Sequence, residues 1–211
     1  MRRLPVYILI QTSGAMRGEP IEAIKVGLET MVASLRQDPF ALESVYLSVI
    51  TFDRTPQVLV PLTELENLQI PEIQQPQAAG THLGEALELV CKKVDQEVQL
   101  STQERKGDWM PLFFLMCDGR ANDLMLFNNI WPLIKSKNFG SIVACSVGAK
   151  TDHGNLRKIT SNIVSLETTD SGTFRQFFKW VSASVSAGNR SIGATDEILL
   201  PPPPPEVHNV I

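Results

Sequence analysis

Continuous apolar strands separated by amphipathic helices constrain the fold of this chain more than any other feature. In strands covered on both faces, apolar residues follow one another instead of alternating with polar ones. Four runs of this kind are predicted core strands, at 6–10, 45–52, 111–117 and 141–147. Between them, apolar residues recur at three- and four-residue steps, for example over 19–35 and 83–98, which indicates amphipathic helices. Strands joined by long helical crossovers favour a mostly parallel sheet.

Two weaker strands complete the predicted sheet. Residues 57–62 follow Pro56 and include Pro61, which favours an edge position because proline cannot donate to a ladder. Residues 163–166 form a short sixth strand. We therefore predict a Rossmann-like, doubly wound α/β fold with a mostly parallel six-stranded sheet, one antiparallel edge strand and helices on both faces. A helix over 124–134 should be kinked or interrupted at Pro132.

The chain divides into one folded domain and a tail. Its 211 residues allow one to two domains, and a last helix rich in phenylalanine is predicted to end near Gly188. We therefore predict a domain over 1–188 and a polar, proline-rich tail over 189–211. Pro201 to Pro205 are five consecutive prolines, which favour an extended polyproline II segment. That segment would serve as a ligand for an aromatic groove or as a stiff spacer, although a disordered tail is the favoured interpretation.

Composition excludes several classes of protein and partner. The net charge is -4, with 43% hydrophobic and 20% charged residues, which is typical of a folded domain and gives no polybasic signal for nucleic acid or anionic membrane. No apolar run reaches 18 residues, so no membrane span is predicted. The three cysteines lack C-x-x-C spacing, which favours buried thiols in a reducing compartment over a zinc or redox site. A cytoplasmic location is expected.

Small oxygen-bearing side chains follow the predicted strands at three places. Ser13 comes after the first strand, Thr81 precedes the second long helix, and Asp118 follows the strand over 111–117. In open parallel sheets, ligands bind beyond the carboxyl ends of the strands, and hard divalent cations take oxygen ligands of this kind. Each residue also has a simpler explanation as a helix cap or a turn residue. Their joint occurrence in this order favours a site.

These residues resemble the metal-ion-dependent adhesion site of von Willebrand factor type A domains. That family carries Asp-x-Ser-x-Ser after its first strand, a Thr on a later loop, and an Asp opening a Thr-Asp-Gly turn. The matching positions are Gln11, Ser13, Ala15, Thr81 and Asp118. Five segments resemble more narrowly the bacterial TerY-type subgroup, which is associated with tellurium-resistance and stress gene clusters: RLPVY at 3–7, TSG at 12–14, GEPIEA at 18–23, THLGEAL at 81–87 and WMPLFFLMCDG at 109–119.

Departures from the family pattern concern the ligands themselves. Gln11 stands where the family has its first Asp, and Ala15 where it has its second Ser. The remaining metal ligands are Ser13, Thr81 and Asp118, a depleted set for Mg²⁺ because one negative charge is missing. We therefore expect a degenerate site that holds no cofactor, or weakly bound Mg²⁺ or Mn²⁺ at most. The Gln11 amide is expected to hydrogen-bond Asp118 or Ser13 and partly replace the cation.

The resemblance implies a non-enzymatic protein-interaction module rather than a catalyst. It implies signalling together with a Ser/Thr kinase and a PP2C-type phosphatase, whose genes often lie beside those of the subgroup, with the partner docking on the loops around the degenerate site. One alternative is an Mg²⁺-dependent adhesion domain with a functional site. A second is a nucleotide-binding Rossmann-like enzyme, although Gly14 and Gly18 do not form G-x-G-x-x-G. His82, near the site, is the one acid/base candidate.

Overall fold

A computed structural model describes residues 2–13, 16, 18–74, 80–148, 151–166, 168–191 and 200–210, without the side chains of 188–191. Its strands are β1 (Leu4–Gln11), β2 (Val45–Phe52), β3 (Pro56–Glu64), β4 (Leu112–Cys117), β5 (Ser141–Val147), β6 (Ile163–Leu166) and β7 (His208–Asn209). Its helices are α1 (Glu19–Arg36), α2 (Pro39–Ser44), α3 (Leu83–Glu97), α4 (Leu124–Ser136), α5 (His153–Ile159) and α6 (Ser171–Ser191).

The strands form one mixed sheet in the order β3-β2-β1-β4-β5-β6-β7. The five inner strands run parallel to one another, whereas β3 and β7 pair antiparallel with β2 and β6 at the two edges. The predicted α/β class, the mostly parallel sheet and the antiparallel edge at β3 are confirmed. A seventh strand and a second antiparallel edge are added to the predicted six strands.

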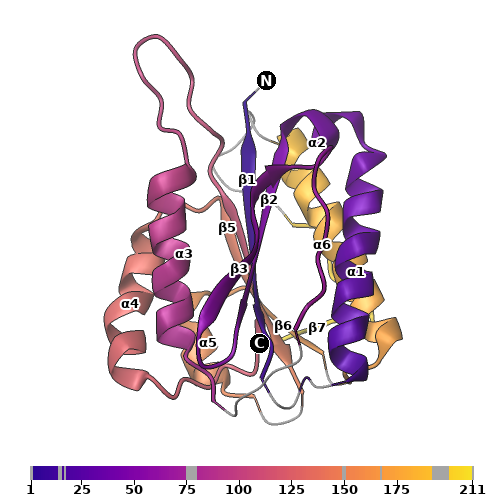
Figure 1. The fold of residues 1–211 in the computed structure, drawn as a ribbon, viewed down its shortest axis with the longest axis vertical. Helices are drawn as coiled ribbons and strands as arrows, with labels where there is room; N and C mark the ends of the chain where they lie inside the picture. The colour runs from indigo at the N-terminus through magenta and orange to yellow at the C-terminus, as the bar shows by residue number, and fades with distance from the viewer. Residues whose placement is uncertain are drawn as a thin grey trace.

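Helices cover both faces of the sheet, as predicted. In Figure 1, α1, α2 and α6 lie on one side of the strands and α3, α4 and α5 on the other. Strand side chains that alternate in sequence therefore divide between two cores. Ile8 and Ile10 pack with the α1 and α6 residues, while Tyr7 and Leu9 pack with those of α3 and α4. All four are at most 2% exposed, which explains why β1 is apolar along its whole length.

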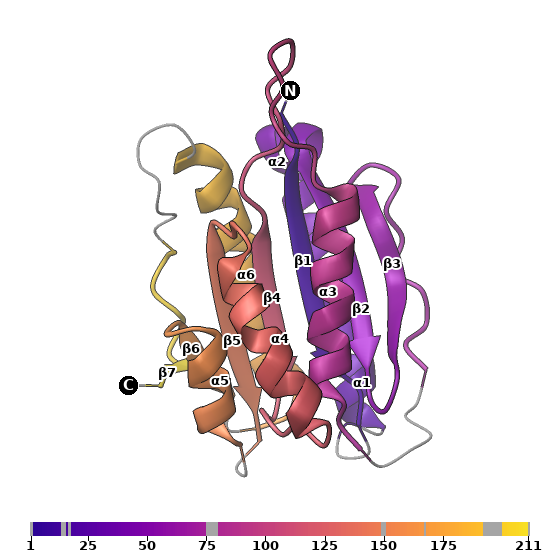
Figure 2. The same cartoon turned by 90° about the vertical axis from the view of Figure 1, so that its left-hand side faces the viewer.

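The extra strand comes from the predicted proline-rich tail, of which the structure describes residues 200–210. His208 and Asn209 pair with Ser165 and Val164 of β6, and Val207 is only 2% exposed. The prolines have no N–H to donate to a ladder, but the residues that follow them carry N–H donors and include the buried Val207. Residues 192–199 lie outside the described residues. Figure 2 shows the tail beside β6 and α6.

Helix boundaries differ from the sequence-based expectations at several points. α4 runs through Pro132 to Ser136, so the helix is not interrupted at this proline, although a kink or an interruption was predicted there. Its loss of one backbone donor is outweighed by burial of Phe127, Ile130 and Ile134 on the core side. The short helices α2 and α5 were not predicted. Each begins after an aspartate, and in both the carboxylate accepts a backbone N–H of the first turn.

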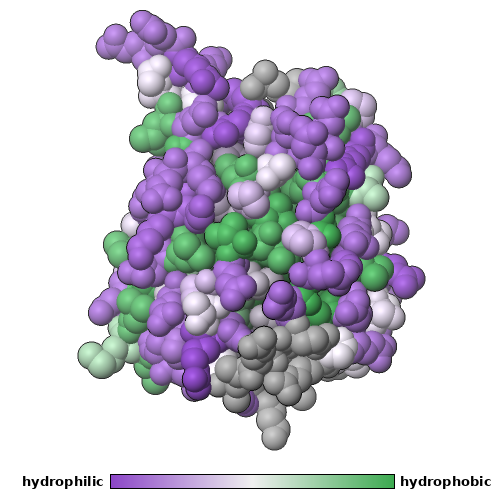
Figure 3. Space-filling view, viewed as in Figure 1, coloured by the Kyte–Doolittle hydropathy of each residue, from purple (hydrophilic) through white to green (hydrophobic). Residues whose placement is uncertain are grey.

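The two ends of the molecule carry different loops. At the amino-terminal end of the parallel strands, residues 98–111 form a protruding loop, at the top of Figures 1 and 2. The Arg3 guanidinium donates two hydrogen bonds to the Asp108 carboxylate, at 2.9 and 2.6 Å, and so fixes the base of this loop. On the face shown in Figure 3, apolar residues gather between the two helical layers over β3. At the opposite end lie the loops that follow the strands, where the site residues are found.

Candidate functional site

The candidate site lies at the carboxyl edge of the sheet, where β1 and β4 end side by side. β1 ends at Gln11 and β4 at Cys117, and their register pairs Ile10 with Met116. β2 follows on one side of β1, whereas β4 lies on the other side. The strand order therefore reverses here, which is where open α/β sheets bind ligands. These loops lie at the lower end of the molecule in Figure 1.

The Gln11 side chain joins all three predicted site loops. Its Nε2 donates to the Ser13 hydroxyl at 2.7 Å and, more weakly, to the Thr81 hydroxyl at 3.4 Å. Its Oε1 accepts the backbone N–H of Asp118 at 2.9 Å. Gln11, Ser13 and Thr81 are each at most 7% exposed. The structure thus brings together four of the predicted residues, while Ala15 lies outside the described residues.

Hydrogen-bond chemistry determines which way the Gln11 amide faces. The backbone N–H of Asp118 can only donate, so the atom that faces it must be the amide oxygen. The NH₂ group must then face Ser13 and Thr81, whose hydroxyl oxygens can accept. The reversed amide would place two donors against each other in a buried site, which costs about 1–3 kcal/mol.

As arranged, these residues do not fit a divalent cation. A cation needs oxygen lone pairs directed at it, but the Gln11 NH₂ group points its hydrogens at the two hydroxyl oxygens that would be ligands. Asp118 supplies the single carboxylate of the set, and it is half-buried. Among the described residues, no group of three or more His, Cys, Asp or Glu side chains is placed to hold a metal ion.

Thr81 does not cap the following helix, contrary to the simpler explanation. Its backbone makes two reciprocal bonds with Asn122: Thr81 N–H donates to the Asn122 Oδ1 at 2.7 Å, and Asn122 N–H donates to the Thr81 carbonyl at 2.8 Å. The first turn of α3 is capped from another helix, because the Asp123 carboxylate accepts from Gly84 and Glu85 at 3.1 and 2.8 Å. The Thr81 hydroxyl is thereby positioned toward Gln11.

Asp118 begins a tight turn that is held from the neighbouring loop. Gly119 adopts a φ of +73°, and a Cβ there would lie 2.3 Å from the Asp152 carbonyl oxygen, so both conformation and space require glycine. The Asp118 carbonyl accepts the Asp152 N–H at 2.8 Å. The Asp118 carboxylate accepts the N–H of Arg120 at 3.0 Å. The turn therefore presents one half-buried carboxylate at the edge of the site.

The thiol beside Asp118 is not a nucleophile. Cys117 is 2% exposed, and burial raises the pKa of its thiol to about 12, so it stays protonated at neutral pH. The free, buried state predicted for the cysteines is confirmed. His82, the acid/base candidate, contacts Glu85 of its own helix at 3.3 Å, rather than the Gln11 network.

Asn122, Asp123 and Asp152 were missed by the sequence-based reasoning, although they fix the loops of the site. The signal for the first two was an Asn-Asp pair directly before an apolar helical run, which is typical of a helix start. Nothing in the sequence indicated that Asp123 caps the neighbouring helix instead of its own. Asp152 lies in a polar segment that was not predicted to become helical, so its role as a cap was overlooked.

Comparison with known proteins places this architecture in a family. The fold is a doubly wound α/β domain, and the candidate site lies at its topological switch point. A model of the von Willebrand factor type A domain matches residues 6–180, and the chain belongs to this family, whose members are in general interaction modules rather than enzymes. No curated protein sequence matches the chain.

Solved structures of low sequence identity share the fold. A von Willebrand factor type A structure from Catenulispora acidiphila has a TM-score of 0.66 at 15% identity, covering 88% of this chain and 43% of that one. The ArnB paralog VWA2 from Sulfolobus acidocaldarius has a TM-score of 0.61 at 16% identity, covering 87% and 45%. Proximal thread matrix protein 1 from the mussel byssus, with a zinc-occupied MIDAS motif, has a TM-score of 0.57 at 14% identity, covering 88% and 48%.

This chain therefore spans less than half the length of these structures. At such identities the similarity concerns the fold alone. None of the helices in the described part of the chain combines the length and apolar character that crossing a bilayer requires.

Proposed function

We propose that this chain is a protein-interaction module that docks a partner on the loops around Gln11, Ser13, Thr81 and Asp118 without a resident divalent cation. The observation that carries the proposal is the Gln11 amide, which bridges Ser13 and the Asp118 backbone. The Gln11 side chain then takes the place that an ion has elsewhere in the family, because its hydrogen bonds hold the loops together as one surface.

Exposure decides which groups of this surface reach a partner. Gln11, Ser13 and Thr81 are buried, so they hold the loops in place, while the half-buried Asp118 carboxylate and the exposed Arg120 lie at the surface. Without a cation, the Asp118 carboxylate is a hydrogen-bond acceptor. A partner that contacts it would therefore present a donor, such as a basic side chain or a backbone N–H.

The resemblance to the TerY-type subgroup extends the proposal to a biological setting. We infer a cytoplasmic stress or tellurium-resistance-like signalling system in which a Ser/Thr kinase and a PP2C-type phosphatase are the partners. The support is the set of five matching segments together with the family membership of residues 6–180.

Titration calorimetry with Mg²⁺ and Mn²⁺ tests the absence of a resident ion. We expect no heat of binding at millimolar concentrations, and micromolar affinity would contradict the proposal. Capture of partners from the native cell, with and without Mg²⁺, tests the interaction. The kinase or the phosphatase should be retained equally in both conditions.

Substitution of Asp118 by alanine tests the docking surface. We expect partner affinity to fall about tenfold, as loss of a charge-assisted hydrogen bond predicts. A matched control is Glu104→Ala, which removes an exposed carboxylate from the protruding loop at the other end of the molecule. If Asp118→Ala binds as tightly as this control while remaining folded, the interface lies elsewhere.

The second candidate function is adhesion through a bound cation that an acidic partner group completes. Two observations favour it: Ser13, Thr81 and Asp118 meet at one place, and the mussel byssus structure of the same fold has a zinc-occupied MIDAS motif. This candidate predicts that partner binding requires Mg²⁺ or Mn²⁺ and is abolished by EDTA. The capture experiment with and without Mg²⁺ therefore separates the two functions.

A further inference from the structure

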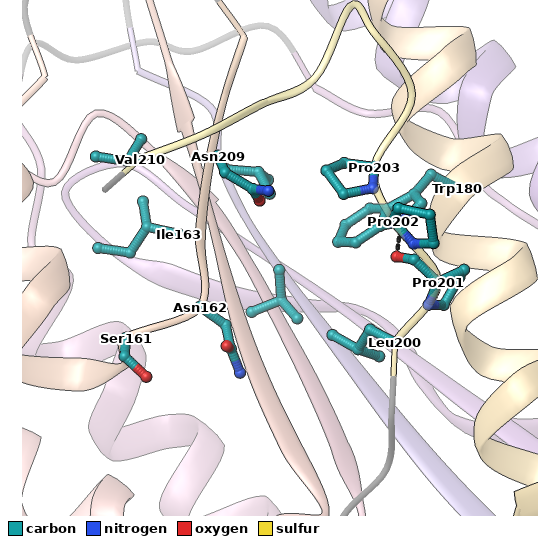
Figure 4. Close-up of a pocket in the computed structure, with 12 residues that line it drawn as sticks. Ser161, Asn162, Ile163, Trp180, Leu200, Pro201, Pro202, Pro203, Asn209 and Val210 are labelled. Carbon is teal, nitrogen blue, oxygen red and sulfur yellow. Dashed lines mark hydrogen bonds between the residues drawn. The ribbon is translucent and has the colours of Figure 1, made fainter.

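The proline-rich tail occupies a groove between β6 and α6, far from the Gln11 site along the sheet order. Residues 200–210 enter beside Trp180, turn, and leave as a short strand on the outer edge of β6 (Figure 4). This segment, which we call the strap, is attached to the domain through residues 192–199, which the structure does not describe.

Two different kinds of contact hold the strap. At its proline end, the indole N–H of Trp180 donates to the Pro201 carbonyl at 2.9 Å, the contact drawn as a dashed line in Figure 4. At its strand end, the N–H of Val210 donates to the Ile163 carbonyl at 2.9 Å, and Val207 is buried. These are two of the modes by which domains recognise extended peptides: an aromatic residue with a proline segment, and addition of a strand to a sheet edge.

A cavity lies beside the strap. It has a volume of about 340 Å³, is partly open to solvent and is lined by both the strap and the domain, and its size is within the range of small-molecule binding sites. Its walls are Val143, Ile163 and Trp180 on the domain, and Leu200 with the prolines on the strap. In Figure 4 the Leu200 side chain points into this space. The cavity is partly open to solvent, so a larger apolar side chain at the Leu200 position has room to enter it.

We propose that this groove is a second interaction site, independent of the Gln11 loops, that takes an extended proline-rich peptide of a partner protein, and that the strap is its displaceable internal ligand. The partner peptide has the chemistry of the strap: a proline segment with a carbonyl for Trp180, then a short strand for the edge of β6. It differs at the Leu200 position, where a larger apolar side chain fills the cavity.

A partner peptide fits these observations better than the strap of a second copy. An exchanged strap would make the same contacts as the internal one and leave the same cavity, while losing the high effective concentration of the attached segment. A peptide with a larger side chain gains contacts that the strap does not make, since burying additional apolar surface is favourable. At low protein concentration, therefore, the partner peptide can displace the strap, whereas the strap of a second copy cannot.

The test uses the full chain and a labelled synthetic peptide of residues 200–210, with binding followed by fluorescence anisotropy. Val207→Asp places a carboxylate at a buried apolar position and should release the internal strap. We expect this variant to bind the peptide at least tenfold more tightly than the wild-type chain. Val210→Pro, which removes one ladder donor without entering the core, should act in the same direction. The matched control is Glu206→Gln, an exposed strap position, which should bind like the wild type.

Two further arms test the groove itself. Trp180→Phe in the Val207→Asp background keeps an aromatic ring but removes the N–H donor, and should weaken peptide binding about fivefold. A peptide carrying Leu200→Phe should bind about fivefold more tightly than the natural peptide. Circular dichroism melts verify that each variant is folded.

Three results would overturn the proposal. The first is that the Val207→Asp and Val210→Pro variants are both folded and both fail to bind the peptide. The second is binding that is indifferent to Trp180→Phe. The third is a concentration-dependent wild-type dimer in ultracentrifugation that Val207→Asp abolishes, because it would assign the groove to a second copy of the chain.

Discussion

Exchange of Gln11 for aspartate tests the central structural argument, because it restores the family residue and removes the amide donor. The matched control is Gln11→Asn, which has the same length as aspartate but no charge. Either variant is too short by one methylene to keep the bonds to Ser13 and to the Asp118 N–H, at 2.7 and 2.9 Å in the wild-type chain. Loss of two buried hydrogen bonds at about 1 kcal/mol each lowers the free energy of unfolding by about 2 kcal/mol.

The aspartate variant carries an additional penalty in the absence of metal. Its carboxylate is buried near that of Asp118, so desolvation and repulsion remove roughly 1–2 kcal/mol more. For a domain of this size, 1 kcal/mol shifts the melting temperature by about 2–4 °C. In EDTA we therefore expect Gln11→Asn to melt about 4–8 °C below the wild type, and Gln11→Asp to melt lower still.

Addition of Mg²⁺ should reverse the order of the two variants. An ion at a hundred times its dissociation constant stabilises the folded state by about 2.7 kcal/mol, which raises the melting temperature of Gln11→Asp by roughly 5–10 °C. The wild type and Gln11→Asn should not respond. Adding Ala15→Ser restores the remaining family ligand and should strengthen the response.

Differential scanning fluorimetry in EDTA and in Mg²⁺ measures all of these shifts. The reasoning is refuted if Mg²⁺ stabilises the wild type as much as Gln11→Asp, because the amide then does not stand in place of an ion. It is equally refuted if Gln11→Asp in EDTA melts with the wild type, because the amide bonds then contribute nothing.

Three other predictions follow from single contacts. Asp108→Ala leaves the Arg3 guanidinium without its carboxylate, whose side chain is 3% exposed, and should lower the free energy of unfolding by about 2–4 kcal/mol in urea titrations. Burial raises the pKa of the Cys117 thiol to about 12, so on raising the pH the unfolded chain loses this proton before the folded chain does. The free energy of unfolding should therefore fall as the pH rises above about 9. Cys117→Ala should make this fall with pH less steep. Gly119→Ala forces a Cβ to within 2.3 Å of the Asp152 carbonyl and should lower the melting temperature by at least about 4 °C.

The sheet could be predicted from sequence because burial on both faces leaves a strong signal. β1 and β4 are apolar at nearly every position, and such runs have few explanations besides an inner parallel strand. β7 could not be predicted, since His208 and Asn209 are exposed and polar. Their strand exists through burial of Val207 and through pairing with β6, whose residues lie about 45 positions earlier, as the pairing of Val164 with Asn209 shows.

The residues that make up the candidate site could be predicted from the sequence, but their arrangement could be predicted only in part. The order of strands and loops was sufficient to bring Ser13, Thr81 and Asp118 to one edge of the sheet, and the family resemblance added Gln11. The expectation that the Gln11 amide bonds Ser13 or Asp118 agrees with the structure, which has both bonds. Which end of the amide faces which loop depends on a backbone N–H, and backbone direction in a turn is not encoded by residue type alone.

The two proposed interaction sites are expected to fail independently because they depend on different strands. The Gln11 network depends on the ends of β1 and β4, whereas the strap depends on the outer edge of β6, and β5 lies between the two. Gln11→Asn should therefore change the melting temperature without changing affinity for the labelled strap peptide, and Val207→Asp should open the groove without changing the response to Mg²⁺. If either variant altered both readouts while still folded, the loops and the strap would belong to one coupled surface, and a partner that displaces the strap would also be sensed at Asp118.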